Sequence, residues 1–299
     1  MRTAQQSLQV AVVLLVTASS GDLAGQAVAD PSNTQPDVKL SKKVEREANA
    51  RRRKIAWEIS RKRSHPWAGE YYTGDGLGVN TTLMVAPDAG FVFEFRGCLG
   101  LYDRNFGEVA LSNGMVALSC KYPNSRKGFQ GIAINLVPVS WGARSYLIPA
   151  DDLPGFCNEV NQGGEPRLSG RGHYLLRKGD ESKRVEGFPN VPDKYRPYLL
   201  ARPVDAAISA VVSPAIRSGQ GNLRDTRVTI DAGASHGIRG GMELFITNRE
   251  ALATSVRITK VEAGHSEGVV TPITEGDPAP RVGWRVSTRA PWHDRPATD

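Results

Sequence analysis

Apolar and polar residues alternate through much of the chain between residues 64 and 177, at the period of a β-strand. The clearest stretch places Phe91, Phe93 and Phe95 on one face of a strand. Turn sequences such as Ser112-Asn113-Gly114 separate this stretch from apolar runs at 81–85, 107–111, 115–120 and 132–139. We therefore expect residues 64–177 to form an antiparallel β-meander that curls into a half barrel or a closed barrel.

Residues 151–161 interrupt this domain with the period of a helix. Leu153, Phe156 and Cys157 recur on one face, and Gly163 follows as a stop signal. This spacing predicts one amphipathic helix packed on the sheet.

Residues 41–63 are a second helical segment, without glycine or proline. Val44, Ala48, Ile55 and Ile59 lie along one narrow face, and the opposite side is strongly cationic. We expect an exposed basic helix ahead of the first β domain.

A second β domain follows residues 178–205, whose four prolines are typical of an interdomain linker. Residues 206–289 show no helical pattern and favour a small β-barrel. Its expected strands lie at about 207–212, 227–231, 243–247, 254–261, 268–271 and 284–288. Residues 30–40 and 290–299 are expected to be a disordered leader and a tail.

Two stretches resemble known protein families. Trp67-x-Gly69-x-Tyr71 and the meander that follows resemble uncharacterised secreted bacterial proteins with a lipocalin-like β-meander, which implies a ligand cavity. Gly233-x3-Gly237 and the glycine-rich run after it resemble small β-barrel modules of bacterial envelope assembly proteins, such as the C-terminal module of flagellar assembly protein T. The second resemblance implies a non-catalytic interaction module.

The start of the chain has the pattern of an export signal. A positive start at Arg2 precedes a seven-residue apolar core at 10–16, and Ala27-Val28-Ala29 offers small residues at a cleavage site. Residues 1–29 are therefore predicted to be a signal peptide. The mature protein would be periplasmic or secreted, where disulfides are permitted.

The net charge of +7 is concentrated in one place. Residues 41–63 hold ten basic and three acidic residues, and the other 28 basic residues are balanced by 28 acidic ones. Arg51, Arg52, Arg53 and Lys54 are the candidates for contact with an anionic surface. Because export removes nucleic acid as the usual partner, we expect an envelope protein, an acidic polymer or a peripheral membrane contact. A solvated helix without a specific partner is the alternative.

A hydrolase motif is present but lacks its usual surroundings. Ser235 lies in Gly233-Ala234-Ser235-His236-Gly237, and Asp277 and His293 follow in the order of a catalytic triad. A strand pattern, in place of the required helix, follows the serine, so we favour a glycine-rich β-turn.

A second enzymatic hypothesis uses a carboxylate pair. Glu70, Asp75, Asp103 and Glu108 could supply an acid and a base for glycoside hydrolysis, although nothing in the sequence fixes their separation. The five histidines show no metal-ligand spacing, so no metal or cofactor is expected.

Aromatic side chains and cysteines supply the remaining candidates. If the first domain holds a pocket, its lining would be Tyr71, Phe93, Phe95, Tyr102 and Trp141; the alternative is that they fill the core. Cys98 and Cys120 lie near neighbouring predicted strands and could form a disulfide.

These observations favour an exported, non-enzymatic binding or scaffolding protein of the bacterial cell envelope. An exported hydrolase and a carrier of small apolar ligands remain the alternatives.

Overall fold

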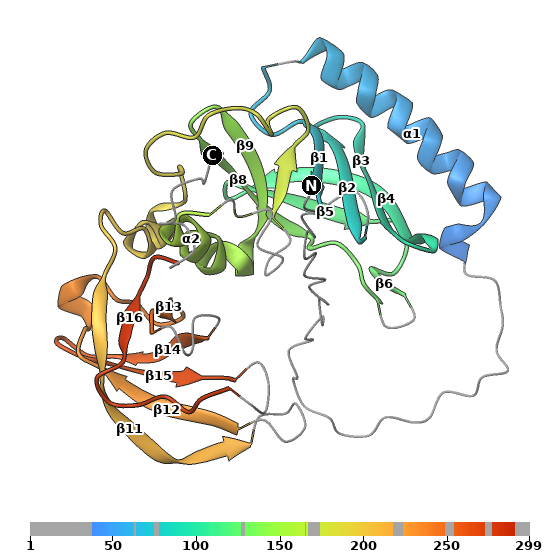
Figure 1. Cartoon of the computed structure of the whole chain (residues 1–299). Helices are drawn as coiled ribbons and strands as arrows, with labels where there is room; N and C mark the ends of the chain where they lie inside the picture. The colour runs from blue at the N-terminus through green and yellow to red at the C-terminus, as the bar shows by residue number, and fades with distance from the viewer. Residues whose placement is uncertain are drawn as a thin grey trace, which may run out of the picture. The chain divides into compact units, whose positions relative to one another are not determined.

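The computed structural model describes residues 38–62, 64–74, 78–126, 129–164, 166, 174–217, 224–248, 254–272 and 277–290. The expected signal peptide at 1–29, Asp75, His293 and nearly all of the tail at 290–299 lie outside these residues. The fold is mainly β, with two closed antiparallel barrels of eight and six strands (Figure 1). This confirms the fold class expected from the sequence.

The first barrel closes because its first strand, β1, pairs with its last strand, β10, as well as with β2. The strand order around it is β1-β10-β9-β8-β5-β4-β3-β2. Asn113 (φ 51°) and Gly114 (φ 74°) form the tight turn between β4 and β5, where left-handed backbone matches the twist of the strands. The strands are β1 (Gly69–Thr73), β2 (Asn80–Ala86), β3 (Gly90–Gly97), β4 (Gly100–Ser112), β5 (Met115–Cys120), β8 (Asn135–Trp141), β9 (Arg144–Pro149) and β10 (Leu175–Arg177). β6 (Ser125–Arg126) and β7 (Phe129–Gln130) form a small separate hairpin.

Alternating side chains fill the inside of this barrel. Tyr71, Leu83, Phe93 and Leu147 are buried there with residues from the other strands. An eight-stranded barrel has an interior about wide enough for its own side chains. The aromatic row predicted on β3 therefore belongs to the core.

A second apolar cluster lies on the outside of β8, β9 and β10, under the predicted helix. The helix forms as η2 (Ala150–Asp152) followed by α2 (Leu153–Gln162), and Gly163 ends it with φ 84°. Phe156 packs edge-on against Tyr146 and Tyr174, with ring centroids 5.4 Å apart in each pair.

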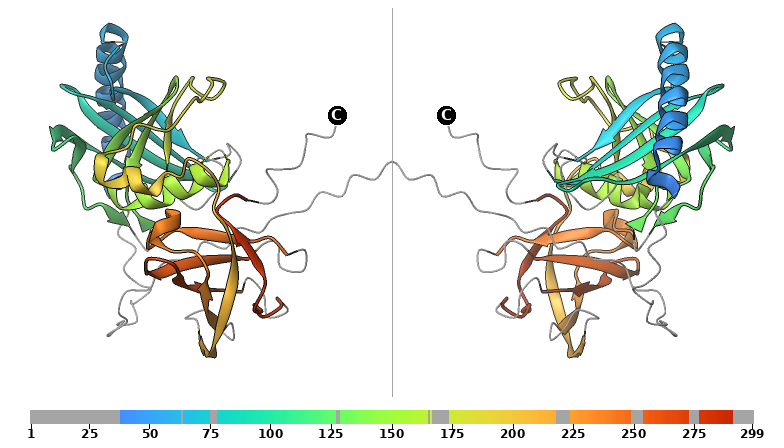
Figure 2. Two further views of the ribbon diagram at one scale, coloured as in Figure 1. Left: turned by 90° about the vertical axis from the view of Figure 1, so that its left-hand side faces the viewer. Right: turned by 90° about the vertical axis from the view of Figure 1, so that its right-hand side faces the viewer.

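The basic segment forms helix α1 (Lys42–Arg61) along the outside of β2, β3 and β4 (Figure 2). Ser41 caps its start by accepting a hydrogen bond from the Val44 backbone N–H. Ala48 and Ile55 are buried against Val92 and Phe106. The narrow apolar face predicted from the sequence is thus the face that meets the barrel.

Residues 178–204 run along the first barrel before the second begins. Val191 is buried, Asn190 bridges to Ser140 of β8, and η4 (Asp193–Tyr198) follows. Tyr195 donates a hydrogen bond to the Ala150 carbonyl. This proline-rich segment is therefore packed against the first barrel.

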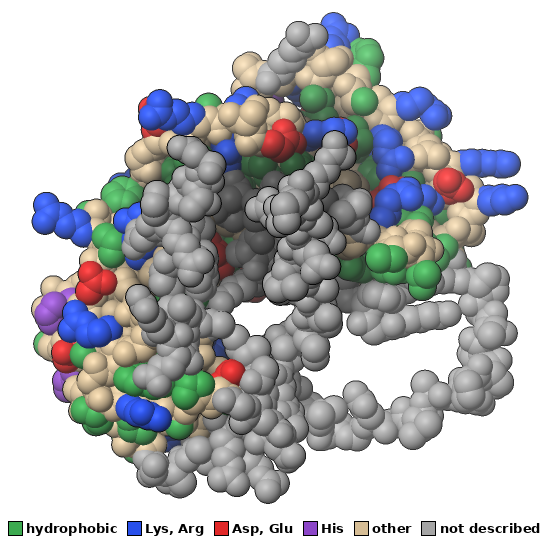
Figure 3. Space-filling view, in the orientation of Figure 1, with side chains coloured by type: hydrophobic (Ala, Val, Ile, Leu, Met, Phe, Trp, Pro, Cys, Tyr) green, Lys and Arg blue, Asp and Glu red, His purple; other side chains and the backbone are tan. Residues whose placement is uncertain are grey.

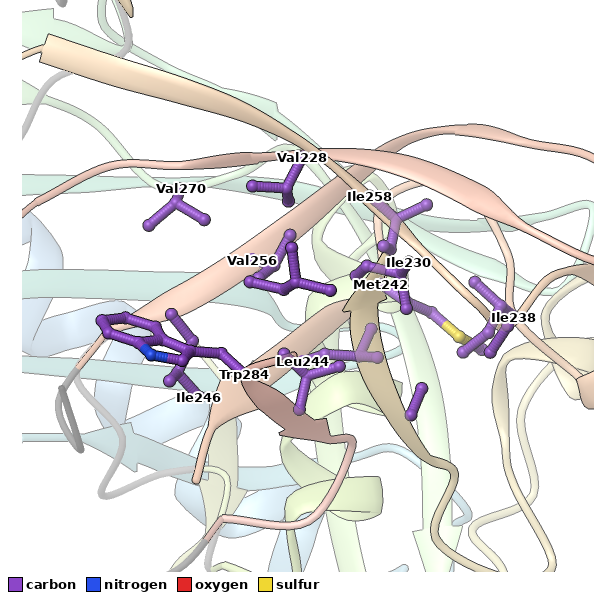
Figure 4. Packing of buried hydrophobic residues seen from close by; sticks show 14 residues of the cluster. Val228, Ile230, Ile238, Met242, Leu244, Ile246, Val256, Ile258, Val270 and Trp284 are labelled. Carbon is purple, nitrogen blue, oxygen red and sulfur yellow. The ribbon is translucent and has the colours of Figure 1, made fainter. Parts of the chain in front are cut away.

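The second barrel has the strand order β11-β12-β15-β14-β13-β16. Figure 4 shows its core, in which aliphatic side chains such as Val228, Leu244 and Val256 pack in one cluster with the ring of Trp284. The strands are β11 (Asp205–Arg217), β12 (Arg224–Ile230), β13 (Glu243–Ile246), β14 (Ser255–Val261), β15 (Ser266–Val270) and β16 (Arg285–Ser287). A short turn of helix, η5 (Ala234–His236), follows β12.

The disulfide expected between Cys98 and Cys120 is wrong, because all three cysteines are free. Cys98 lies in the turn between β3 and β4, whereas Cys120 pairs with Gly107, seven residues along β4 from Gly100. Seven strand residues span about 23 Å, far beyond the reach of a disulfide. Burial raises the pKa of the third thiol, that of Cys157, to about 12.

Candidate functional site

Charged side chains on the inner side of α1 attach the helix to the barrel. The Arg51 guanidinium donates hydrogen bonds to the carbonyl oxygens of Ala89 and Gly107 and pairs with Glu108 at 2.8 Å. Gly90 (φ 79°) makes room for this contact, because a Cβ there would collide with Arg51 and with the Gly107 carbonyl. The turn between β2 and β3 therefore needs a glycine for two reasons: its backbone has a positive φ, and no room is left for a Cβ atom.

Glu94 is the centre of a second attachment point. Its carboxylate lies 2.9 Å from Arg52 of α1, 3.0 Å from Arg104 of β4 and 2.9 Å from Arg96 of its own strand. The Glu94 residue is only 4% exposed. Burial opposes its ionisation, but the hydrogen bonds and charges of Arg52 and Arg96 outweigh burial, so the pKa of Glu94 lies below its usual value of 4.5.

The carboxylate of Glu58 holds the end of α1. It accepts backbone N–H groups from Asp88 at 3.2 Å and from Ala89 at 2.8 Å, and it pairs with Lys62 at 2.8 Å. Lys62 also reaches Asp88, at 2.6 Å. A buried acid inside the most basic segment of the chain thus ties the helix to the turn between β2 and β3.

The outer side of α1 carries cations that the barrel does not use. These cations are Lys42, Lys43, Arg46, Arg53, Lys54 and Arg61. Within the described residues, none of the six forms an ion pair. Figure 3 shows Lys and Arg side chains gathered over α1 on the face in view. We call this set, together with Trp57, the outer face of α1.

Trp57 is the large apolar side chain of the outer face. It is 61% exposed, and the Arg61 guanidinium lies 4.7 Å from its ring centroid. An indole beside cations on an exposed helix has an amphipathic surface that suits a boundary between water and apolar material.

This arrangement corrects part of the predicted anionic-surface contact. The sequence predicts this contact for all four residues from Arg51 to Lys54, but Arg51 and Arg52 point at the barrel and are held by carboxylates and carbonyls. Arg53 and Lys54 face outward. The reason is geometric, since four successive helical residues cover all sides of a helix.

One end of the first barrel contains a buried ion pair. Lys39 of η1 (Val38–Leu40) lies 2.7 Å from Asp103, and the two residues are 4% and 0% exposed. The Lys39 ammonium also donates to the Pro123 carbonyl, and the Oδ2 atom of Asp103 has no hydrogen-bond partner among the residues that the structure describes. Residues 38–40, which we expected to be disordered, are thus ordered by a buried charge.

The three predicted carboxylates that the structure describes, Glu70, Asp103 and Glu108, do not form an acid–base pair; the fourth, Asp75, lies outside the described residues. Asp103 points into the barrel and is neutralised by Lys39, whereas Glu108 lies five residues along the same strand and points outward to Arg51. Glu70 pairs with Lys178 at 3.1 Å. An odd spacing along a strand puts two side chains on opposite faces, so Asp103 and Glu108 cannot share a substrate.

A surface cleft of about 310 Å³ lies where β1 and β10 meet the end of α1. Arg177 lines it, but that guanidinium bonds to the Tyr71 hydroxyl and the Pro66 carbonyl. Glu70 and Lys178, which also line the cleft, pair with each other. The charges of the cleft are satisfied internally.

The structure places Ser235 in a tight turn without a catalytic helix. Its hydroxyl donates to the Ala263 carbonyl at 2.7 Å, and the Nδ1 atom of His236 is 3.3 Å away. That Nδ1 accepts the backbone N–H of Gly233, so its lone pair is engaged. Asp277 is half-buried in another loop, and His293 lies outside the described residues. The turn interpretation fits this geometry.

The five aromatic candidates do not line one pocket. Tyr71 and Phe93 are buried inside the barrel, with Phe95 packed against them. Tyr102 packs against Phe95 with the rings tilted by 56° and their centroids 5.6 Å apart. Trp141 belongs to the cluster outside the barrel, where it donates to the Gly187 carbonyl at 2.8 Å. The expectation of a shared lining is wrong for Trp141, because its position on β8 faces away from the interior.

Sequence reasoning missed Lys39, Glu58 and Glu94 as attachment residues. The sequence contains a partial signal for Glu94. This residue alternates with the phenylalanines of β3, which places it on the outer side of that strand. The ion pairs depend on contacts between distant segments, which no local pattern shows.

Within the described residues, no group of three or more His, Cys, Asp and Glu side chains could hold a metal ion. Nor does that part of the chain contain a helix long and apolar enough to cross a bilayer. No protein-family model, curated protein or solved structure matches the chain.

Proposed function

We propose that the protein is an exported, non-enzymatic binding protein of the bacterial cell envelope, and that it attaches to an anionic surface through the outer face of α1. The observation that carries this proposal is the separation of charges on one helix. The charged side chains on the inner side of α1 form ion pairs and hydrogen bonds there. Six outward cations have no ion-pair partner in the described structure.

Export and location rest on the sequence of residues 1–29. The signal-like start makes envelope surfaces the available anionic partners. The resemblance of the second barrel to modules of envelope assembly proteins supports a non-catalytic role for that domain.

The enzymatic alternatives have less support. The Ser235 hydroxyl donates its proton to a carbonyl, and the described carboxylates point to different sides of the barrel. The carrier alternative needs an apolar cavity. Inside the barrel, where such a cavity would lie, Tyr71, Phe91 and Phe93 pack with other buried apolar side chains.

The test is sedimentation of the purified protein with washed bacterial envelope fragments at increasing NaCl. Binding should fall steeply over the salt range in which the Debye length shortens from about 30 Å to about 8 Å. The variant Lys42→Glu/Arg46→Glu/Arg53→Glu should lose binding, because it reverses three outward charges.

A matched control changes three exposed arginines elsewhere, Arg202→Glu/Arg257→Glu/Arg281→Glu, with the same change in net charge. This control should retain binding. Failure of the natural protein to sediment with the fragments, or equal loss in both variants, would overturn the proposal.

A further inference from the structure

The outer face of α1 has a geometry that distinguishes among anionic surfaces. Lys42, Arg46, Arg53 and Trp57 are spaced by four, seven and four residues, so they lie along one line of the helix. Lys43, Lys54 and Arg61 form a neighbouring line. The helix has 20 residues and is therefore about 30 Å long. The cations form a straight band.

The acidic residues of α1 leave this band uninterrupted. Glu58 is buried against the turn between β2 and β3, and Glu47 is bound to Lys121 at 2.6 Å. Glu45 is exposed, but its position lies on the flank of the helix, away from the two lines. A flat anionic surface could therefore meet the whole length of the band at once.

From this geometry we propose that the partner of α1 is a bilayer rich in anionic phospholipid headgroups, on which the helix lies flat with Trp57 at headgroup level. The inference rests on the function proposed above and names the class of its partner. Trp57 favours a bilayer over an acidic polymer, because indole partitions into the boundary between headgroups and acyl chains. A polymer contact would be satisfied by the cations alone.

The packing of the inner side of α1 determines how the helix could attach to a bilayer. An ordinary interfacial helix buries its apolar face among the acyl chains. Here Val44, Ala48 and Ile55 are already buried against the barrel. The attachment is therefore shallow and electrostatic, with the indole of Trp57 as its one large apolar contact.

The experiment measures partition of the full chain onto vesicles in a centrifugation assay. One set contains phosphatidylglycerol and phosphatidylcholine in equal amounts, and the other contains phosphatidylcholine alone. We expect at least tenfold stronger partition onto the anionic vesicles, and loss of that preference at high salt. Lys42→Gln/Arg46→Gln/Arg53→Gln should weaken partition at least tenfold, whereas Arg202→Gln/Arg257→Gln/Arg281→Gln should leave it unchanged.

Trp57→Phe tests the bilayer itself. The chain contains five tryptophans, so the spectrum of Trp57 is taken as the difference between the natural protein and this variant. That difference spectrum should shift to shorter wavelength on anionic vesicles, and the variant should bind several-fold more weakly. Because Trp57 is exposed, its replacement should leave the unfolding curve unchanged, which shows that the variant is folded.

Three results would overturn the inference. They are equal partition onto both vesicle types, an unshifted Trp57 spectrum on vesicles that bind the protein, and binding to poly-L-glutamate without binding to anionic vesicles. In the last case sedimentation with envelope fragments would persist, so the proposed function would survive while its lipid partner would not.

Discussion

Arg51 and Arg53 are two positions apart in the same basic run, yet they have opposite roles. At about 100° per residue, two helical positions point to nearly opposite sides. Arg51 is bound by the Ala89 and Gly107 carbonyls and by Glu108, and Arg53 is exposed. The sequence shows how many cations there are; only their position around the helix shows which of them remain available to a partner.

Glu94 leads to a pH-dependent prediction at the residue scale. Its pKa is lowered in the folded protein, so its stabilising contribution is complete above 4.5 and is lost as the pH falls through the lowered value. Glu94→Gln should reduce the free energy of unfolding by about 3 kcal/mol at pH 7, since three arginines lose their shared carboxylate. Urea denaturation should show the gap between the two proteins closing below pH 4.5.

The control for this prediction is Glu186→Gln at an exposed carboxylate. It should change the free energy of unfolding by less than about 0.5 kcal/mol. A gap for Glu94→Gln that stays constant down to pH 3, or that widens on acidification, would contradict the assigned ion pairs.

At the scale of elements, α1 is part of the folded core of the first domain. Ile55 is 0% exposed and packs with residues of β2, β3 and β4, whereas Trp57 is 61% exposed and does not belong to that cluster. Ile55→Ala should cost about 2–4 kcal/mol of unfolding free energy, and Trp57→Ala less than about 0.5 kcal/mol. Chemical denaturation measures both. Equal effects of the two substitutions would mean that the helix is not docked as described.

The strands were predictable where alternation and turns agree. In the second barrel, each of the six expected segments overlaps one strand. The segments at 243–247, 254–261 and 284–288 contain β13, β14 and β16, whereas those at 207–212, 227–231 and 268–271 match only part of β11, β12 and β15. β9 was missed because Arg144–Pro149 follows β8 after only a two-residue turn and ends in a proline. The Cys98–Cys120 pairing failed for a different reason, because Cys98 lies in the turn before β4 and Cys120 pairs with Gly107, well along that strand.

At the scale of the whole molecule, charge is distributed asymmetrically. Residues 41–63 carry the entire net charge of +7, and part of that segment is neutralised by acids of the barrel. The positive charge that remains lies on the outer face of α1. The binding properties of the chain should therefore depend on a single helix surface rather than on its high isoelectric point of about 9.4.

Cation-exchange chromatography at pH 7 tests this asymmetry. Lys42→Glu/Arg46→Glu/Arg53→Glu should elute at clearly lower salt than Arg202→Glu/Arg257→Glu/Arg281→Glu, although the two variants have the same net charge. A charged resin contacts one face of a protein at a time, so local charge density governs retention. Coelution of the two variants would show that the molecule behaves as an evenly charged body.

The two sides of α1 also differ in the freedom they leave to sequence change. Arg51, Arg52 and Glu58 are held by specific barrel atoms, so replacing them disturbs the fold. Lys42 and Arg53 are exposed and form no ion pair within the described structure, so they can change without a folding cost. A lineage carrying this protein could strengthen, weaken or abandon the proposed attachment within a few substitutions and keep both barrels intact. The architecture thus allows selection to adjust the charge of this surface separately from folding.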